Sequence, residues 1–466
     1  MISIADRVFY HIYPLGMCGT PDRNDFSSPA GSGLRSIGDH IPRLLDMGIN
    51  ALYLGPLFES TAHGYDTLDY CHADRRLGNN EDLKNLVQKL HENGIIVVLD
   101  AVLNHTGRHF FAFKDLQERG VDSPYKDWFV NVDFNRQSPL GDRFWYEGWS
   151  GHYDLVKLNT ANPAVREHLF GAVRFWMEEF GIDGLRLDAA DALEPGFMTA
   201  LSRHCKAIKE DFWLMGEVIH GDYRAWANRD RLDSTTNYEL YKGLWSSFND
   251  KNFFEIAWSL NRQSGAEGMY KDLSLYTFVD NHDVNRAASI LKNPVHLFPL
   301  YGLLFTVPGI PSIYYGSEFG IRGERTPNSD RQLRPAWDFP GGFPGGETSE
   351  LKPLVDSTAL WETIRNCIRI RKETPALKTG NYRQLYVSSE QFAFMRQQGE
   401  LQQQQQVIVA VNASEKDTTI KIPPHMLNSG NKRWYDLLNN ETFHVSRDGC
   451  LNILLSPSWL RILEGR

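Results

Sequence analysis

Charged and polar side chains stand at the ends of four apolar, β-rich segments of this 466-residue chain. One of these segments, "GLRLD" at 184–188, places Arg186 and Asp188 two residues apart, on the same face of an extended strand. Two others end at Glu217 and lead to Asp283. A single acidic residue at a strand end is weak evidence for a functional site, because surface loops often begin with Asp. Several that converge would form a pocket of three carboxylates and a cation.

Three carboxylates in one pocket suit the cleavage of a glycosidic bond. Burial and neighbouring charges move carboxyl pKa values apart, so that one group stays ionised while another holds a proton near neutral pH. This division of roles is what cleavage of the bond needs. A fixed cation lowers the pKa of an adjacent carboxyl group. The sequence therefore predicts that Arg186 keeps Asp188 ionised.

The hydrophobic pattern predicts a scaffold that could bring these strand ends together. Short, unalternated apolar runs suit strands that are buried on both faces. Such runs cover residues 8–14, 51–56, 95–100, 184–188, 212–217, 275–280 and 310–316. Segment 234–240 is a weaker candidate for an eighth strand. Amphipathic segments such as 37–48 and 79–94 alternate with the runs and predict helices.

The repeated order of strand and helix indicates an α/β protein. It favours a closed (β/α)8 TIM barrel, assigned to residues 1–105 and 161–380, over the alternative of an open doubly wound sheet. Segment 106–160 is rich in aromatic residues, Gly and Asp, and its length predicts an inserted subdomain B after the third strand. Residues 381–466 carry short β-like pieces, which predict a C-terminal antiparallel β-sandwich domain. The glutamine run at 402–406 predicts an exposed hairpin loop.

Composition narrows the choice of partner and compartment. The net charge of −9 is modest, and without a long Lys/Arg cluster the sequence predicts no nucleic acid partner. We expect no membrane association, because no segment is apolar over a membrane-spanning length and the first residues lack the pattern of an export signal. Five scattered cysteines without a CxxC pair argue against a disulfide framework and a zinc site. These features predict a cytoplasmic protein with a neutral substrate.

Four motifs resemble those of the α-amylase family, glycoside hydrolase family thirteen. In chain order they are "DAVLNH", "GLRLDAAD", "GEVI" and "FVDNHD", and their joint presence is specific. The resemblance covers most of the chain, from the barrel to the C-terminal domain. It implies that Asp188 is the nucleophile and that Glu217 is the general acid and then the base. Asp283 would bind sugar hydroxyls and support the oxocarbenium-like transition state.

The same resemblance implies substrate-binding roles for further residues. Tyr65, in the motif "HGYD", would stack on the sugar at the point of cleavage, and His63 lies beside it in the sequence. His105 and His282 would donate hydrogen bonds to sugar hydroxyls, and Arg186 is counted with them among the substrate-binding residues. Outside this context a lone Tyr is more often a core residue, and a lone His is more often structural.

The sequence does not decide whether a metal ion is bound or which of two arginines reaches the sugar. Asn104 matches a position that ligates calcium in calcium-dependent members of the family, but a calcium site needs several oxygen ligands and the inserted segment shows no second set. We therefore expect no required cofactor, and a structural calcium ion is possible but unsupported. Asp100 is interpreted as support for the barrel rim. In "NSDRQLRPAW" the family places an Asp and an Arg that reach the sugar, and Arg331 and Arg334 are both candidates.

The segment "LVKLN" at 155–159 resembles a signature of the neopullulanase and cyclomaltodextrinase group. It favours a retaining hydrolase that cleaves α-1,4 bonds of maltooligosaccharides or cyclodextrins. An α-glucan transglycosylase or glucosyltransferase of the same family is the main alternative. A catalytically inactive amylase-like binding protein is disfavoured, because all three carboxylates are present.

Two departures from that group leave questions open. Its members normally carry an additional N-terminal β-domain used in dimer formation, whereas here the first predicted strand lies within the first residues, so the oligomeric state stays unknown. Asp191 stands where many members have Lys or Asn facing the product-side sugar. It either alters acceptor binding or satisfies backbone amides at a helix start.

Overall fold

The computed structural model describes residues 3–327, 329–337, 351–399, 404–427 and 430–466. Its central element is a parallel sheet of β1 (Phe9–Ile12), β2 (Ala51–Leu54), β5 (Ile96–Ala101), β9 (Gly184–Leu187), β10 (Trp213–Gly216), β11 (Ser234–Thr235), β12 (Tyr276–Phe278) and β13 (Ile310–Tyr314). The spatial order is β11-β10-β9-β5-β2-β1-β13-β12. A parallel bridge between Thr236 and Tyr276 joins the two end strands. The predicted barrel is therefore confirmed.

The barrel strands are buried on both faces, which explains their apolar sequences. Every residue of β1, β2, β9 and β10 is buried, because one face packs inside the barrel and the other packs under helices. The predicted strand at 234–240 is shorter in the structure: only Ser234–Thr235 forms β11, and α8 (Tyr238–Asn249) begins three residues later.

Helices surround the barrel, as the amphipathic pattern predicts. They include α4 (Asn80–Glu92), α6 (Pro163–Phe175), α7 (Pro195–Ile208), α8, α9 (Phe253–Ser264), α11 (Leu297–Thr306) and α12 (Ser357–Glu373). The side chains of Asn79 and Asp82 cap the start of α4 reciprocally. Segment 37–48, predicted as one helix, is instead split between α2 (Gly33–Gly38) and α3 (Ile41–Met47). Pro42 lacks the N–H that a continuous helix would donate to Gly38.

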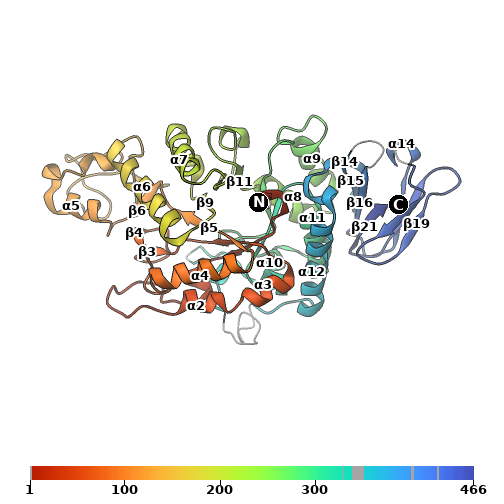
Figure 1. Ribbon diagram of the computed structural model, residues 1–466, viewed down its shortest axis with the longest axis horizontal. Coiled ribbons are helices and arrows are strands. Elements are labelled where there is room, and N and C mark those ends of the chain that lie inside the picture. The colour runs from red at the N-terminus through yellow and green to blue at the C-terminus, as the bar shows by residue number, and fades with distance from the viewer. Residues whose placement is uncertain (1–2, 328, 338–350, 400–403, 428–429) are drawn as a thin grey trace.

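Two excursions leave the barrel on the side where strands β2 and β5 end. After β2 the chain forms a hairpin of β3 (Phe58–Ser60) and β4 (Thr67–Ala73). After β5 it forms β6 (His105–Gly107), α5 (Phe111–Arg119), β7 (Gly148–Trp149) and β8 (His152–Lys157), with the three strands in the order β6-β8-β7. In Figure 1, α5 lies at the end of the molecule opposite the C-terminal domain. The hairpin turn carries His63 and Tyr65, and the second excursion begins at His105.

The C-terminal domain contains two antiparallel sheets, which confirms the predicted β-sandwich. One has the order β14-β15-β16-β21-β18-β19 and the other pairs β17 with β20. Their bounds are β14 (Asn381–Val387), β15 (Gln391–Gln398), β16 (Gln405–Asn412), β17 (Thr418–Ile422), β18 (Arg433–Asp436), β19 (Thr442–His444), β20 (Leu451–Leu455) and β21 (Trp459–Gly465). Gln405 and Gln406 belong to β16 and Gln406 is buried, so the hairpin-loop prediction is wrong for these two residues. Residues 402 and 403 lie outside the described residues.

Buried Arg396 connects this domain to the end of α11, and buried Arg371 of the barrel helix α12 binds carbonyls in the same region. Arg396 Nη1 in β15 donates to the Thr306 carbonyl at 2.7 Å, and Arg371 in α12 donates to the carbonyls of Phe305 at 3.0 Å and Gly309 at 2.6 Å. The last carbonyls of a helix have no partner within it, so these contacts satisfy groups that burial would otherwise leave unpaired. None of the helices in the described segments is both long and apolar enough to cross a bilayer.

Candidate active site

Arg186 is the centre of a cluster of carboxylates at the ends of β5, β9 and β10. Its Nη1 lies 2.8 and 3.1 Å from the two oxygens of Asp100 and 2.9 Å from Oδ1 of Asp188. Its Nη2 lies 2.9 Å from Oε1 of Glu217. Strand register explains the arrangement, because Arg186 is the direct neighbour of Asp100 across β5 and β9. Only 3% of Arg186 is exposed, so water screens these contacts weakly.

Asp283 follows β12 and lies between two cationic or hydrogen-bonding groups. Its Oδ2 is 2.9 Å from Nε2 of His282, and its Oδ1 is 3.0 Å from Nη2 of Arg334. The Arg334 guanidinium packs 4.6 Å above the ring centre of Tyr13. The structure thus brings Arg334 to the site, whereas the side chain of Arg331 is 82% exposed.

The hairpin after β2 carries Tyr65 to His282. Their rings are stacked, with centres 5.7 Å apart, and the Tyr65 hydroxyl contacts His282 Nε2 and lies 3.2 Å from Asp100 Oδ2. His63 lies at the rim with a half-exposed side chain, and its Nδ1 accepts a hydrogen bond from the Tyr65 N–H at 3.3 Å. Asp66 fixes the turn, because its carboxylate accepts the His63 N–H at 3.1 Å.

His105 faces Asp188 from the first residue of β6. Its Nε2 lies 3.8 Å from Asp188 Oδ2, and its Nδ1 lies 3.3 Å from the Asn104 amide nitrogen. Nε2 is buried and has no hydrogen-bond partner among the described residues. It is therefore a buried ring nitrogen that faces Asp188 without a protein hydrogen-bond partner among the described residues.

The Arg186 guanidinium does not act on Asp188 alone, and this corrects the sequence-based interpretation. Burial raises the pKa of Asp188 well above its usual range despite the attraction of Arg186, and the charges of Glu217 and Asp100 add to the rise. Burial likewise raises the pKa of Glu217, with Arg186 opposing and Asp283 adding to the shift. Asp188 and Glu217 together therefore keep a proton to higher pH than isolated carboxyl groups would.

The neighbouring groups have fixed charge states near neutral pH. Burial opposes ionisation of Asp283, but His282 and Arg334 outweigh it and hold the pKa of Asp283 below its ordinary range. Burial lowers the pKa of His105 to about 3, so its imidazole is neutral. The site thus combines a permanent anion at Asp283 with a proton-binding pair at Asp188 and Glu217.

Sequence reasoning missed the groups that hold Glu217. The N–H of Ala189, a residue with left-handed backbone (φ 45°, ψ 45°), donates to Glu217 Oε2 at 3.1 Å. The Tyr238 hydroxyl lies 3.5 Å from Glu217 Oε1 and accepts from the Asn281 amide at 3.1 Å. The polar "TNY" within the weak eighth-strand candidate was the available signal for Tyr238. No sequence pattern marks the backbone conformation of Ala189.

Asp191 lies outside this cluster, in the short 3-10 turn Ala190–Ala192, and is exposed. Partial burial raises the pKa of its carboxyl group, and the backbone N–H groups of Asp191 and Ala192 oppose the shift. These local contacts agree with the backbone-satisfying interpretation, although α7 itself begins later, at Pro195. Within the described ranges, no group of three or more His, Cys, Asp or Glu side chains is arranged to hold a metal ion.

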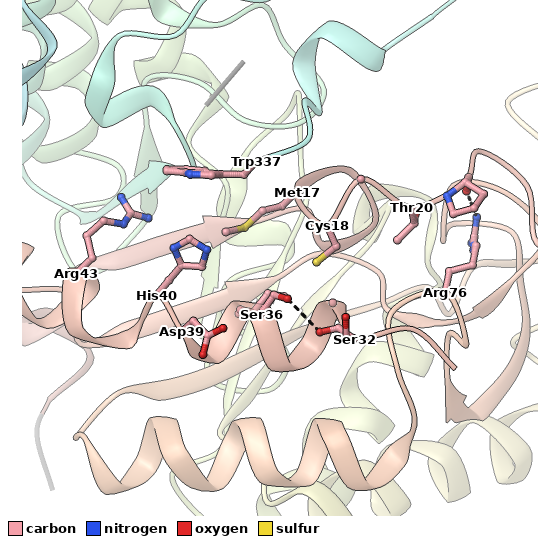
Figure 2. A pocket seen from close by; sticks show the side chains of 14 residues that line it. Met17, Cys18, Thr20, Ser32, Ser36, Asp39, His40, Arg43, Arg76 and Trp337 are labelled. Atoms are coloured by element: carbon pink, nitrogen blue, oxygen red, sulfur yellow. Dashed lines mark hydrogen bonds between the residues drawn. The ribbon is translucent and has the colours of Figure 1, made fainter. Parts of the chain in front are cut away.

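A separate pocket of about 540 Å³ opens between the loop after β1 and helices α2 and α3. Figure 2 shows Met17, Cys18, His40 and Trp337 around it, with Arg43 at one end. None of the three candidate carboxylates lines this pocket. Arg43 in the lining of this pocket already forms an ion pair with the buried carboxylate of Glu318.

Comparisons with known proteins agree with the barrel and with the family resemblance of the sequence. The family model "Alpha amylase, catalytic domain" matches residues 20–380. Neopullulanase 2 of Thermoactinomyces vulgaris is 33% identical over 474 residues, which cover 97% of this chain and 76% of that protein. A cyclomaltodextrinase from a Bacillus species is 31% identical over 441 residues, covering 90% and 74% of the two chains. A solved structure of the cyclic α-maltosyl-(1→6)-maltose hydrolase from Arthrobacter globiformis has a TM-score of 0.78 and 26% identity, with 99% of each chain covered.

The barrel with carboxylates at its strand ends defines a glycoside hydrolase of the TIM-barrel type. The family match and the sequence identities show that the chain belongs to the α-amylase family. The resemblance to the neopullulanase and cyclomaltodextrinase group is also confirmed.

Proposed function

We propose that this chain is a retaining α-glucan hydrolase that cleaves α-1,4 bonds of maltooligosaccharides or cyclodextrins. The observation that carries the proposal is the contact of Asp188 and Glu217 with the two amino groups of one buried guanidinium, that of Arg186. Two carboxyl groups that share one cation and retain a proton between them suit the nucleophile and acid–base pair of a covalent mechanism. The names of the related neopullulanase and cyclomaltodextrinase support small or cyclic glucans as substrates.

In the first step, ionised Asp188 attacks the anomeric carbon and the glycosidic bond breaks. Glu217 gives its proton to the departing oxygen, so no alkoxide has to form. The product of this step is a glycosyl ester on Asp188 with inverted configuration. The raised pKa values of the pair support a reactive form with one proton, which we assign to Glu217.

In the second step, the ionised Glu217 takes a proton from water, and the water oxygen attacks the anomeric carbon from the face that the leaving group vacated. The ester bond to Asp188 breaks and the carboxylate returns. Two inversions give net retention. Asp283, held ionised by His282 and Arg334, would accept sugar hydroxyls and stabilise positive charge on the ring in both steps.

The remaining predicted site residues would bind the sugar at the cleavage point. His105 has a buried Nε2 without a partner, and His282 has a buried Nδ1 without one, among the described residues. Sugar hydroxyls would satisfy both, because an unpaired buried polar group is costly. Tyr65 offers a partly exposed ring for stacking, and His63 stands at the rim beside it. Arg186 acts through the carboxylates that it contacts.

No step of this scheme requires a cofactor, and we propose that activity is independent of metal. We also propose a cytoplasmic location, since all five cysteines are free thiols in the structure. Transglycosylation to a sugar acceptor remains the second candidate activity, because it differs only in what enters during the second step. Asp191 is the residue near the nucleophile that bears on this choice.

A substrate panel tests the proposal. Purified protein is incubated with cyclodextrins, maltooligosaccharides, pullulan, starch granules, sucrose and trehalose, and products are followed over time. We expect kcat/KM for cyclodextrins or maltooligosaccharides to exceed that for starch granules by far. Equal or better turnover of granules would contradict the proposed specificity, and longer oligosaccharides as main products would favour transglycosylation.

A further inference from the structure

Tyr238 links the general acid to the loop that carries Asp283. It begins α8 directly after β11, and its ring packs edge-on against Phe278 of β12, with centres 5.0 Å apart. Its hydroxyl lies between Asn281 and Glu217, at 3.1 Å from the Asn281 amide nitrogen and 3.5 Å from Glu217 Oε1.

The direction of these hydrogen bonds follows from a backbone group. The Asp283 N–H donates to the Asn281 amide oxygen at 2.8 Å, and a backbone N–H is always a donor. The Asn281 oxygen is therefore turned toward Asp283, and its NH2 group is turned toward Tyr238. Since the Tyr238 oxygen accepts that hydrogen bond, the single hydroxyl proton of Tyr238 is available for Glu217 Oε1.

The two oxygens of Glu217 consequently differ. Oε1 is approached by two donors, the Tyr238 hydroxyl and Arg186 Nη2, which lies at 2.9 Å. Oε2 accepts from the Ala189 N–H alone among the hydrogen bonds of the described residues. Oε1 already faces the hydrogen atoms of two donors, so an added proton on Glu217 is more favourable on Oε2.

We propose that Tyr238 is a positioning residue that fixes the orientation of Glu217 and directs its catalytic proton to Oε2. The inference deepens the proposed function and rests on Glu217 as its general acid. A donor to the carboxylate also favours the ionised form, so Tyr238 restrains the upward pKa shift that burial produces at Glu217. The acid can then also serve as the base of the second step.

Removal of the Tyr238 hydroxyl would leave in place the other charged groups that face Glu217. They are Arg186 and Asp188 of the β9 strand end, and Asp283 and His282 after β12. Any shift in the protonation of Glu217 in a Tyr238→Phe variant can therefore be assigned to the lost hydroxyl. Tyr241→Phe is a matched control, because Tyr241 lies one turn further along α8 and stacks on the same Phe278.

The experiment measures kcat/KM for a maltooligosaccharide across pH, which reports the pKa of the acid in the free enzyme. In Tyr238→Phe we expect the alkaline limb to move up by about one pH unit. A weak hydrogen bond to a charged group shifts a pKa by about this much, and the contact of Tyr238 with Glu217 is a long one. Tyr241→Phe should keep the wild-type limb. Placing 3-fluorotyrosine, a stronger donor, at position 238 alone should move the limb down.

The outcomes separate this inference from the proposed function. Wild-type protein without activity on any glucan would overturn the proposed function, whatever the variants do. An active Tyr238→Phe variant with an unmoved alkaline limb would overturn the role of Tyr238 alone. A shift of the limb in the same direction for 3-fluorotyrosine and for Tyr238→Phe, or an equal shift in Tyr241→Phe, would also overturn it.

Discussion

Replacing Arg186 by Met removes the cation that contacts Asp100, Asp188 and Glu217. Loss of one partner from a buried ion pair costs about 3–5 kcal/mol, and we expect a loss of this size in the free energy of unfolding at pH 8. Without the cation the pKa values of Asp188 and Glu217 rise further above their unfolded values. The folded protein then binds more protons than the unfolded chain, so its stability falls as pH rises through this window.

The loss should therefore be smaller at lower pH. One additional proton on the folded state changes stability by about 1.4 kcal/mol per pH unit, so up to about 4 kcal/mol of the loss should disappear over the three units from pH 8 to pH 5. Urea denaturation at pH 5 and pH 8 measures the difference between variant and wild type. The matched control is Arg371→Met, another buried arginine, whose hydrogen bonds go to backbone carbonyls. An equal loss at both pH values in Arg186→Met, or the same pH dependence in Arg371→Met, would refute the reasoning.

Three further predictions address the sugar-binding groups and the metal question. His105→Ala should lower kcat/KM by about 10- to 100-fold through a lost hydrogen bond to substrate, and the acid limb of the pH profile should stay in place because the pKa of His105 is about 3; a displaced limb would show that His105 titrates during catalysis. Arg334→Ala should reduce kcat/KM by about 10-fold or more through the loss of its contact with Asp283, while exposed Arg331→Ala should keep the wild-type value; equal effects would argue against a role for Arg334. Dialysis against a chelator should leave kcat largely intact even if Tm falls, and a loss of turnover that calcium restores without refolding would contradict metal independence.

The barrel could be predicted from the sequence because its signal is local. Buried parallel strands must be apolar along their whole length, and seven such runs coincide with seven of the eight strands. The pattern of the eighth strand was weak because β11 has only two residues, which pair with β10. The break between α2 and α3 could have been read from Pro42, but the amphipathic pattern of segment 37–48 concealed it.

The candidate site could be predicted less completely. Residues at strand ends were found because the barrel gathers them, whereas Tyr238 and Ala189 act through hydrogen bonds between elements that are far apart in sequence. The choice of Arg334 over Arg331 depends on the direction of each side chain, which no spacing rule supplies. The rise in the pKa of Asp188 could not be predicted for a similar reason. Its neighbour Arg186 is visible in the sequence, but the other carboxylates that share this cation are not.

The central claim is that Asp188 and Glu217 perform a retaining, covalent reaction as nucleophile and acid–base. Glu217→Gln should lower hydrolysis of maltooligosaccharides by about 10²- to 10⁴-fold, because the departing oxygen receives no proton. With α-maltosyl fluoride, whose leaving group needs none, Asp188 of this variant should still become glycosylated and then remain so for want of a base.

Azide attacks without a base, so identifying the sugar azide formed by Glu217→Gln from α-maltosyl fluoride is the most direct test. The account predicts renewed turnover and an α-maltosyl azide, with Asp188→Asn giving no such retained product. A β-maltosyl azide from Glu217→Gln, or near wild-type hydrolysis of maltooligosaccharides by this variant, would contradict the account.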